Sequence, residues 1–244
     1  MEITKREILF GTIIAAIMIG LGVLLSGPII TSATDSALRT VSAVQVEDST
    51  RFDYIRRTDV GDFLAEGDLF VVDPVSIPDI SGQYGKIEKI KEEYREHTRT
   101  VTETDSEGHT HTRTETYWEW DRVDSWKWES DVLRFLGHTF TPHQIEYRFR
   151  THYKETIEPK AGFFGVRTRY KYYTAPTVEH GTIIGIAKDK QFTSTTFERT
   201  TIKEIIENAN SNIDVAPVLF WVLWMLLTGG IIVGFFYAEN HWLY

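Results

Sequence analysis

Two apolar runs decide the fold of this chain: ILFGTIIAAIMIGLGVLLSGPII at residues 8–30 and VAPVLFWVLWMLLTGGIIVGFFY at residues 215–237. Neither run contains Asp, Glu, Lys, Arg or His. Because a helix rises about 1.5 Å per residue and the hydrocarbon core of a bilayer is about 30 Å thick, each run can cross a membrane. The sequence therefore predicts transmembrane helices at 8–30 and 215–237, short terminal segments at 1–7 and 238–244, and a polar domain between the spans.

The polar region between the spans is acidic. The 244-residue chain has a formal net charge of −9, and residues 31–214 hold 24 Lys and Arg against 32 Asp and Glu. Since nucleic acids and anionic membrane surfaces attract clustered positive charge, this balance argues against both as targets of the domain. The chain has no cysteine, which excludes disulfides, thiolate metal sites and a cysteine nucleophile.

The charges beside the spans predict the orientation. Lys5 and Arg6 precede the first span, whereas Asp214 and Glu239 flank the second. By the positive-inside rule both termini are expected in the cytoplasm, with the large domain extracytoplasmic or lumenal. The first run is longer than the apolar region of a secretory signal, so we expect a retained signal anchor; the small residues at 31–33 leave cleavage as the alternative.

Small residues at four-residue spacing occur in both spans, at Ala16 and Gly20 and at Gly230 and Gly234. Such spacing lets two helix backbones approach closely. Packing of the first helix on the second and self-association are both open, as is the plain explanation that glycine is common in membrane helices.

The region between the spans is expected to be an α+β domain with a mainly antiparallel sheet at 51–214, entered through a connector at 31–50 with a short strand near 41–46. Strands are expected at 68–73, 144–152, 166–173 and 182–187, where apolar or alternating residues lie between turn-forming ones. Thr201 and Glu204 form a capping-box pattern that predicts a short amphipathic helix to Asn208, ended by the Asn-rich residues 208–212.

The turn sequence DSEG at 105–108, flanked by alternating Thr-rich sequence, predicts a long β-hairpin. If Thr104 pairs with His109, Thr102 lies opposite His111 and Thr98 lies opposite Glu115. Neither face of such a hairpin is apolar, so we expect it to project into solvent or to lie against a partner.

Aromatic residues accumulate where the hairpin enters the domain: Tyr117, Trp118, Trp120, Trp126 and Trp128. Two interpretations are open. Large aromatics can close a small β core, or they can form a surface that stacks on a glycan or contacts a lipid headgroup.

The histidines give only weak signals. His109 and His111 lie two apart on one strand, a spacing found in some metal sites, but no third ligand follows from the sequence and solvated side chains are the plainer interpretation. His138, His143 and His152 match no metal-binding or acid–base pattern. We find no catalytic or nucleotide-binding motif, and therefore expect no enzyme activity and no cofactor.

Three stretches resemble the transmembrane protein 43 (LUMA) family. They are AEGDLFVVDP at 65–74, IKEEYRE at 90–96 followed by TETYWEW at 114–120 with Trp126, and the acidic helix at 202–208 that leads into a span. The resemblance implies one membrane helix followed by a β-rich extracytoplasmic domain, and a membrane-organising protein without catalytic residues. That family usually has several further C-terminal spans, whereas this chain has one.

Two functional hypotheses follow. The first is a non-catalytic membrane scaffold, or a structural component of a membrane-associated assembly, whose domain contacts other membrane or envelope proteins or copies of itself. The alternative is a membrane-bound module that binds a glycan or lipid headgroup through the aromatic cluster. Under either hypothesis the chain is embedded in the lipid bilayer and does not bind nucleic acid.

Overall fold

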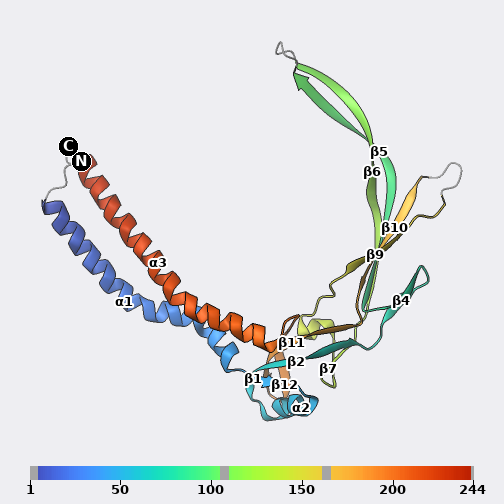
Figure 1. The fold of residues 1–244 in the computed structure, drawn as a ribbon, viewed down its shortest axis with the longest axis horizontal. Helices are drawn as coiled ribbons and strands as arrows, with labels where there is room; N and C mark the ends of the chain where they lie inside the picture. The colour runs from blue at the N-terminus through green and yellow to red at the C-terminus, as the bar shows by residue number, and fades with distance from the viewer. Residues whose placement is uncertain (1–4, 105–109, 161–165, 243–244) are drawn as a thin grey trace. The chain divides into compact units, whose positions relative to one another are not determined.

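The computed structural model describes residues 5–104, 110–160 and 166–242 (Figure 1). Two long apolar helices at the ends of the chain flank a mainly antiparallel β domain, which confirms the predicted α+β class. The helical elements are α1 (Lys5–Ser42), α2 (Ser49–Thr58), the 3-10 helix η1 (Pro142–Ile145) and α3 (Ile202–Trp242).

The described strands form three sheets. The first has the order β12-β11-β2-β7-β8, with β1 pairing in parallel to β2; the second has the order β6-β5-β10-β9; and the third is the β3–β4 pair. The strands are β1 (Val44–Val46), β2 (Gly61–Val71), β3 (Val75–Ile77), β4 (Ile80–Tyr84), β5 (Lys86–Thr104), β6 (Thr110–Glu129), β7 (Leu133–Phe135), β8 (His138–Phe140), β9 (His152–Ile157), β10 (Thr168–Ala175), β11 (Val178–Lys188) and β12 (Gln191–Glu198).

Both terminal helices are longer than the apolar runs inside them. α1 has 38 residues and α3 has 41, which gives lengths of about 57 and 62 Å, roughly twice the hydrocarbon thickness of a bilayer. By length and composition each could cross a membrane. Each contains one proline, Pro28 or Pro217, and both helices are bent (Figure 1), as expected where a proline removes a backbone hydrogen bond.

Two predicted breaks are absent from these helices. The expected connector at 31–50 is helical as far as Ser42, and α3 continues through the Asn-rich residues 208–212. Buried positions explain the difference: Thr34 and Ala209 are only 5% and 6% exposed. Packing of one helix face outweighs the small intrinsic cost of Thr and Asn in a helix.

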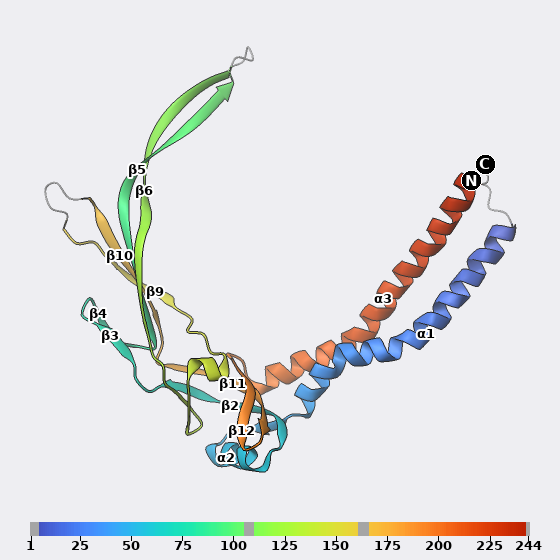
Figure 2. The ribbon, with the colours of Figure 1, turned by 180° about the vertical axis from the view of Figure 1, so that it is seen from behind.

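α1 and α3 lie side by side in both ribbon views (Figures 1 and 2). The indole Nε1 of Trp224 donates a hydrogen bond to the carbonyl oxygen of Met18 at 2.8 Å. A Cβ built on Gly22 would lie 2.5 Å from the same nitrogen. The missing side chain of Gly22 therefore makes room for the indole that joins the helices.

The small residues named from the sequence do not make this contact. Ala16 is exposed, and a Cβ on Gly20, Gly230 or Gly234 would meet nothing within 4 Å. None of these residues therefore lies at the described Trp224–Gly22 contact, because spacing shows that small residues share a face but not which way that face turns. Their use in self-association stays a prediction.

The chain divides into two compact units, which we describe separately: Met1–Glu66 with Ile184–Thr193 and Thr200–Tyr244, and Gly67–Ile183 with Ser194–Arg199. In the first unit, Phe52 stacks on Phe192 with ring centroids 4.6 Å apart. The predicted capping box is present, since the Glu204 amide donates to Thr201 Oγ1 and the Thr201 amide to Glu204 Oε2. Glu66 Oε2 accepts from the Ile202 amide at 2.7 Å, which places a negative charge at the start of α3, where the helix dipole favours it.

In the second unit, Ile80, Ile87 and Tyr172 form a buried cluster. The hydroxyl of Tyr172 donates to Asp79 Oδ2 at 3.0 Å, and Lys89 Nζ donates to the same oxygen at 2.6 Å. Burial raises the pKa of Tyr172, and the hydrogen bond from Lys89 lowers that of Asp79. This trio of polar groups ties the turn before β4 to β5 and β10 at the edge of the cluster.

The predicted strands at 68–73, 166–173 and 182–187 correspond to parts of β2, β10 and β11. The strand expected at 144–152 is wrong over most of its length. There the chain forms η1, in which Thr141 and Gln144 make a reciprocal cap, and β9 begins only at His152. Local hydrogen bonding by Thr141 competes with strand pairing at this point.

Candidate functional site

The most unusual element of the second unit is the long pairing of β5 with β6. β10 pairs with β5 only from Lys86 to Glu93, with one further hydrogen bond from the Tyr94 amide to the Arg167 carbonyl. Beyond that point, residues 95–104 and 110–119 pair only with each other among the described strands. We call these residues the ribbon; it extends past the end of β10 in Figures 1 and 2.

The register of the ribbon differs by one residue from the expected one. Thr104 pairs with Thr110 rather than with His109, which lies outside the described residues, and Thr102 pairs with Thr112 rather than with His111. Because side chains alternate between the faces of a strand, this one-residue shift exchanges the faces of one strand relative to the other.

As a result, an unbroken row of threonines lies on one face of the ribbon, beyond the Glu96–Trp118 pair at its base. Four cross-strand pairs follow one another on this Thr face: Thr98 with Thr116, Thr100 with Thr114, Thr102 with Thr112, and Thr104 with Thr110. All eight side chains belong to exposed residues. The β-branched side chains favour extended backbone and present a row of hydroxyl groups without an apolar core beneath them.

The opposite, charged face explains the register. Arg99 lies opposite Glu115 and donates to it at 2.8 Å, while Arg113 bonds both Glu103 at 3.0 Å and Glu115 at 2.7 Å. Hydrogen bonding from Arg99 holds the pKa of Glu115 below its ordinary value. Opposite charges facing each other across a strand pair stabilise that register, and in the expected register Arg99 and Glu115 would point to opposite sides.

A β-bulge divides the aromatic cluster between the two faces. Glu92 pairs with Arg122 and Lys91 pairs with Asp124, so Val123 is the extra residue. By strand alternation, Trp118 and Trp120 lie on the side of the Thr face, and Trp126 and Trp128 lie on the opposite side with Tyr117. The five aromatic residues therefore do not form one surface.

None of the four indoles is fully buried. Trp118 is 52% exposed, Trp126 and Trp128 are each 38% exposed, and Trp120 is intermediate. Tyr94 stacks on Trp118 with centroids 5.5 Å apart. These rings flank the base of the ribbon rather than fill a closed core.

An ion-pair network supports the ring of Trp120. The guanidinium of Arg169 lies 4.1 Å from the centroid of this ring and bonds Glu92 Oε2 at 2.5 Å, and Lys171 bonds the other oxygen of Glu92 at 3.0 Å. Burial of Glu92 acts to raise its pKa, but hydrogen bonds from Lys171 and Arg169 outweigh it and leave the pKa below the ordinary value. The network joins β5 to β10 at the level where the third strand ends.

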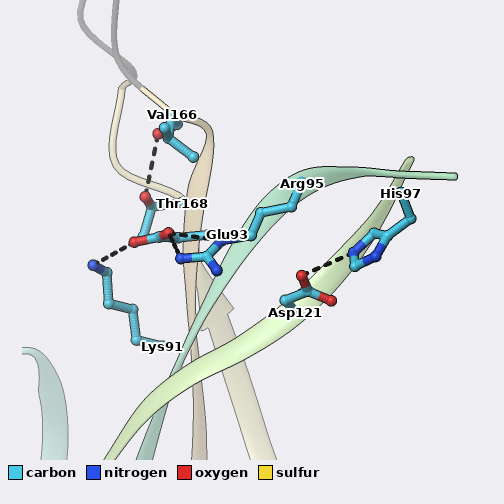
Figure 3. A network of polar contacts seen from close by, with 7 residues as sticks. All are labelled: Lys91, Glu93, Arg95, His97, Asp121, Val166 and Thr168. Atoms are coloured by element: carbon cyan, nitrogen blue, oxygen red, sulfur yellow. Dashed lines mark hydrogen bonds and ion pairs between the residues drawn. The ribbon is translucent and has the colours of Figure 1, made fainter. Parts of the chain in front are cut away.

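A second polar cluster lies at the base of the charged face. His97 Nε2 is 2.8 Å from Asp121 Oδ2 (Figure 3), and it lies 3.7 Å from Glu119 Oε1. The ring of Tyr117 stacks against the imidazole with centroids 5.5 Å apart and an interplanar angle of 25°. The sequence did not indicate this cluster because the expected register places His97 on the face opposite Glu119 and Asp121.

The other histidines lie apart from this cluster in the secondary structure. His111 is exposed and pairs with Glu103, two pairs beyond the Arg99–Glu115 pair along the charged face. His138, His143 and His152 belong to β8, η1 and β9, three different elements.

Comparison of the chain with models of known protein families, with curated proteins and with solved structures gave no match.

Proposed function

We propose that this chain is a non-catalytic, two-span membrane protein whose β domain binds a protein partner through the ribbon. The main support for this proposal is the length of the ribbon. Its ten residue pairs, 95–104 with 110–119, extend beyond the end of β10 without an apolar face. A two-stranded hairpin is marginally stable in water by itself. We therefore expect the extension to become more stable when another molecule covers it.

The backbone of the ribbon favours a protein partner. β6 is an edge strand of its sheet over its whole length, and β5 loses its second neighbour after Glu93. Edge strands present unpaired N–H and C=O groups that an added strand can satisfy. The Thr face offers hydroxyl groups beside that edge, and the arginines and glutamates of the charged face oppose indiscriminate pairing.

The resemblance to the transmembrane protein 43 family supports the same class of function, since it implies a membrane-organising protein. The proposed topology has both termini in the cytoplasm and the β domain extracytoplasmic or lumenal, because Lys5 and Arg6 precede the first span. The chain contains no cysteine, so single cysteines report topology without background. We expect Thr139→Cys to be shielded from an impermeant maleimide on the cytoplasmic side and Glu2→Cys to be labelled there; the reverse pattern would refute the orientation.

The partner-binding role is tested by changing the Thr face while keeping the ribbon paired. In the double variant Thr100→Lys with Thr114→Glu, opposite charges replace two facing threonines, so cross-strand pairing is retained. Thr139→Glu is the control, because Thr139 is an exposed strand threonine outside the ribbon and lies opposite Arg134.

The measurement is chemical crosslinking of the full chain in its native membrane, followed by mass spectrometry. We expect crosslinks from the ribbon to a protein partner in the wild type and in Thr139→Glu, and their loss in the double variant. Absence of any crosslinked partner in the wild type, or equal crosslinking in all three proteins, would reject binding through the Thr face.

The exposed indoles favour a second candidate, binding of a glycan or lipid headgroup. Because the bulge puts Trp118 on one side and Trp126 and Trp128 on the other, a single ligand would use only one of these groups. The test is binding of the purified chain to a glycan array and to phosphatidylglycerol vesicles. Loss of binding in Trp118→Ala, with crosslinking to proteins unchanged, would favour this candidate over the first.

A further inference from the structure

We propose that His97, Glu119 and Asp121 form a binding site for a divalent transition-metal ion of the Zn²⁺ type. One imidazole nitrogen and one oxygen from each carboxylate lie within 4.8 Å of one another. The two distances from His97 Nε2 are 2.8 Å to Asp121 and 3.7 Å to Glu119. Ligand atoms about 2.0–2.1 Å from a tetrahedral Zn²⁺ lie about 3.4 Å from each other, so small side-chain rotations bring these atoms into position.

The charges around the cluster favour a bound cation. Each of the two carboxylates forms its ion pair with His97. The neighbouring guanidinium groups are directed to other acids, since Arg95 bonds Glu93 at 2.8 Å and Arg99 bonds Glu115 at 2.8 Å. Two carboxylates therefore converge on one imidazole, and a divalent ion would balance both of their negative charges, whereas one histidine carries at most a single positive charge.

The strands hold the three side chains in place. Glu119 and Asp121 are two residues apart on β6 and so share the charged face, and His97 extends from β5 on the same side. The Tyr117 ring stacked on His97 limits rotation of the imidazole. The side chains of His97 and Asp121 are about one-third exposed, which leaves a route from solvent and room for a fourth ligand.

The donor set selects the class of metal. Ca²⁺ and Mg²⁺ prefer six or more oxygen ligands, whereas imidazole nitrogen together with carboxylate oxygen suits Zn²⁺ and its first-row neighbours. Three protein ligands leave one coordination position for water or for a group from another molecule. The site goes beyond the proposed partner binding and does not depend on it, because its ligands lie on the face opposite the threonines.

The test is isothermal titration of the metal-free full chain in detergent with ZnCl₂, using a purification tag that contains no histidine. The variants are His97→Ala and Asp121→Asn, and the matched control is His111→Ala, which removes another histidine from the charged face of the ribbon. Replacing Zn²⁺ with Co²⁺ adds an absorption spectrum that reports the coordination geometry. Circular dichroism of each variant shows whether the β domain remains folded.

We expect one Zn²⁺ per wild-type chain, at least about tenfold weaker binding in His97→Ala and Asp121→Asn, and unchanged binding in His111→Ala. A four-coordinate Co²⁺ spectrum that disappears in His97→Ala would support the site further. No binding by the wild-type chain would overturn the proposal. It would also be overturned by binding that survives both ligand variants, or by binding that only His111→Ala abolishes, since the ion would then lie elsewhere.

Discussion

Replacing Gly22 tests how α1 and α3 are joined. A Cβ at this position would lie 2.5 Å from Trp224 Nε1, 2.8 Å from Trp224 Cδ1 and 3.1 Å from Trp221 Cζ3. The Trp224 ring must therefore move by several tenths of an ångström or more, and its hydrogen bond to Met18 is lost or stretched. Overpacking of this kind costs about 1–3 kcal/mol, and an interhelical hydrogen bond in a membrane contributes about 0.6 kcal/mol.

Alanine also has a higher helix propensity than glycine, by up to about 1 kcal/mol. The net effect expected for Gly22→Ala is thus a loss of about 1–3 kcal/mol in helix-pair stability. Gly20→Ala is the matched control, because a Cβ there meets nothing within 4 Å, and it should be neutral or slightly stabilising. Tryptophan fluorescence during unfolding of the full chain in mixed micelles measures both.

A double-mutant cycle with Trp224→Ala separates the clash from other effects. If the indole is the cause, Gly22→Ala should cost much less in the Trp224→Ala background than in the wild type. Equal stability of Gly22→Ala and Gly20→Ala would show that the helix contact described here is incorrect. An unchanged cost in the Trp224→Ala background would place the clash with another side chain.

The remaining predictions concern the second unit. Thr102→Cys with Thr112→Cys should form a disulfide under mild oxidation, whereas Thr102→Cys with His111→Cys should not, because only directly opposite residues on one face have suitable Cα separation; the opposite result, by gel shift, would restore the other register. Glu92→Gln should lower the free energy of unfolding by about 1–3 kcal/mol, since two cationic partners lose a charged acceptor, and thermal unfolding that matches the wild type would contradict this. Because the pKa of Glu92 is lowered on folding, its contribution is complete above the unfolded-state pKa near 4.3 and is lost as the pH falls through the folded-state pKa. The stability difference between wild type and Glu92→Gln should therefore shrink in that acid range, and a difference that does not change there would refute the assignment.

The parts of the fold that depend on local pattern could be predicted from the sequence. The apolar runs at 8–30 and 215–237 lie inside α1 and α3, and the Thr201–Glu204 cap begins α3 where expected. The capped turn at Thr141 was missed because Thr and Gln at that spacing suit a short helix as well as a loop before a strand. α1 continues through 31–42 and α3 continues through 208–212 because one face of each helix is packed. Local helix propensity does not describe such tertiary contacts.

Prediction of the candidate site from the sequence required the correct register of the β5–β6 pair. Pairing of the opposite charges of Arg99 and Glu115 favours the observed register. The turn sequence at 105–108 instead favours the register that differs by one residue. In the expected register His97 lies on the face opposite Glu119 and Asp121, and the threonines of the two strands do not share one face. The bulge at Val123 likewise could not be foreseen, and it turned an apparent tryptophan cluster into two groups on opposite sides.

The alternation of the ribbon has a consequence for how such a chain can evolve. Even-numbered positions from Thr98 to Thr104 and from Thr110 to Thr116 make one surface, and odd-numbered positions make the other. Point substitutions can therefore change either surface while the other stays intact. Inserting or deleting one residue within a strand would exchange the surfaces beyond that point. Insertions or deletions within the paired strands should therefore be tolerated in steps of two residues. Insertions or deletions of one residue should be confined to the connection between the strands.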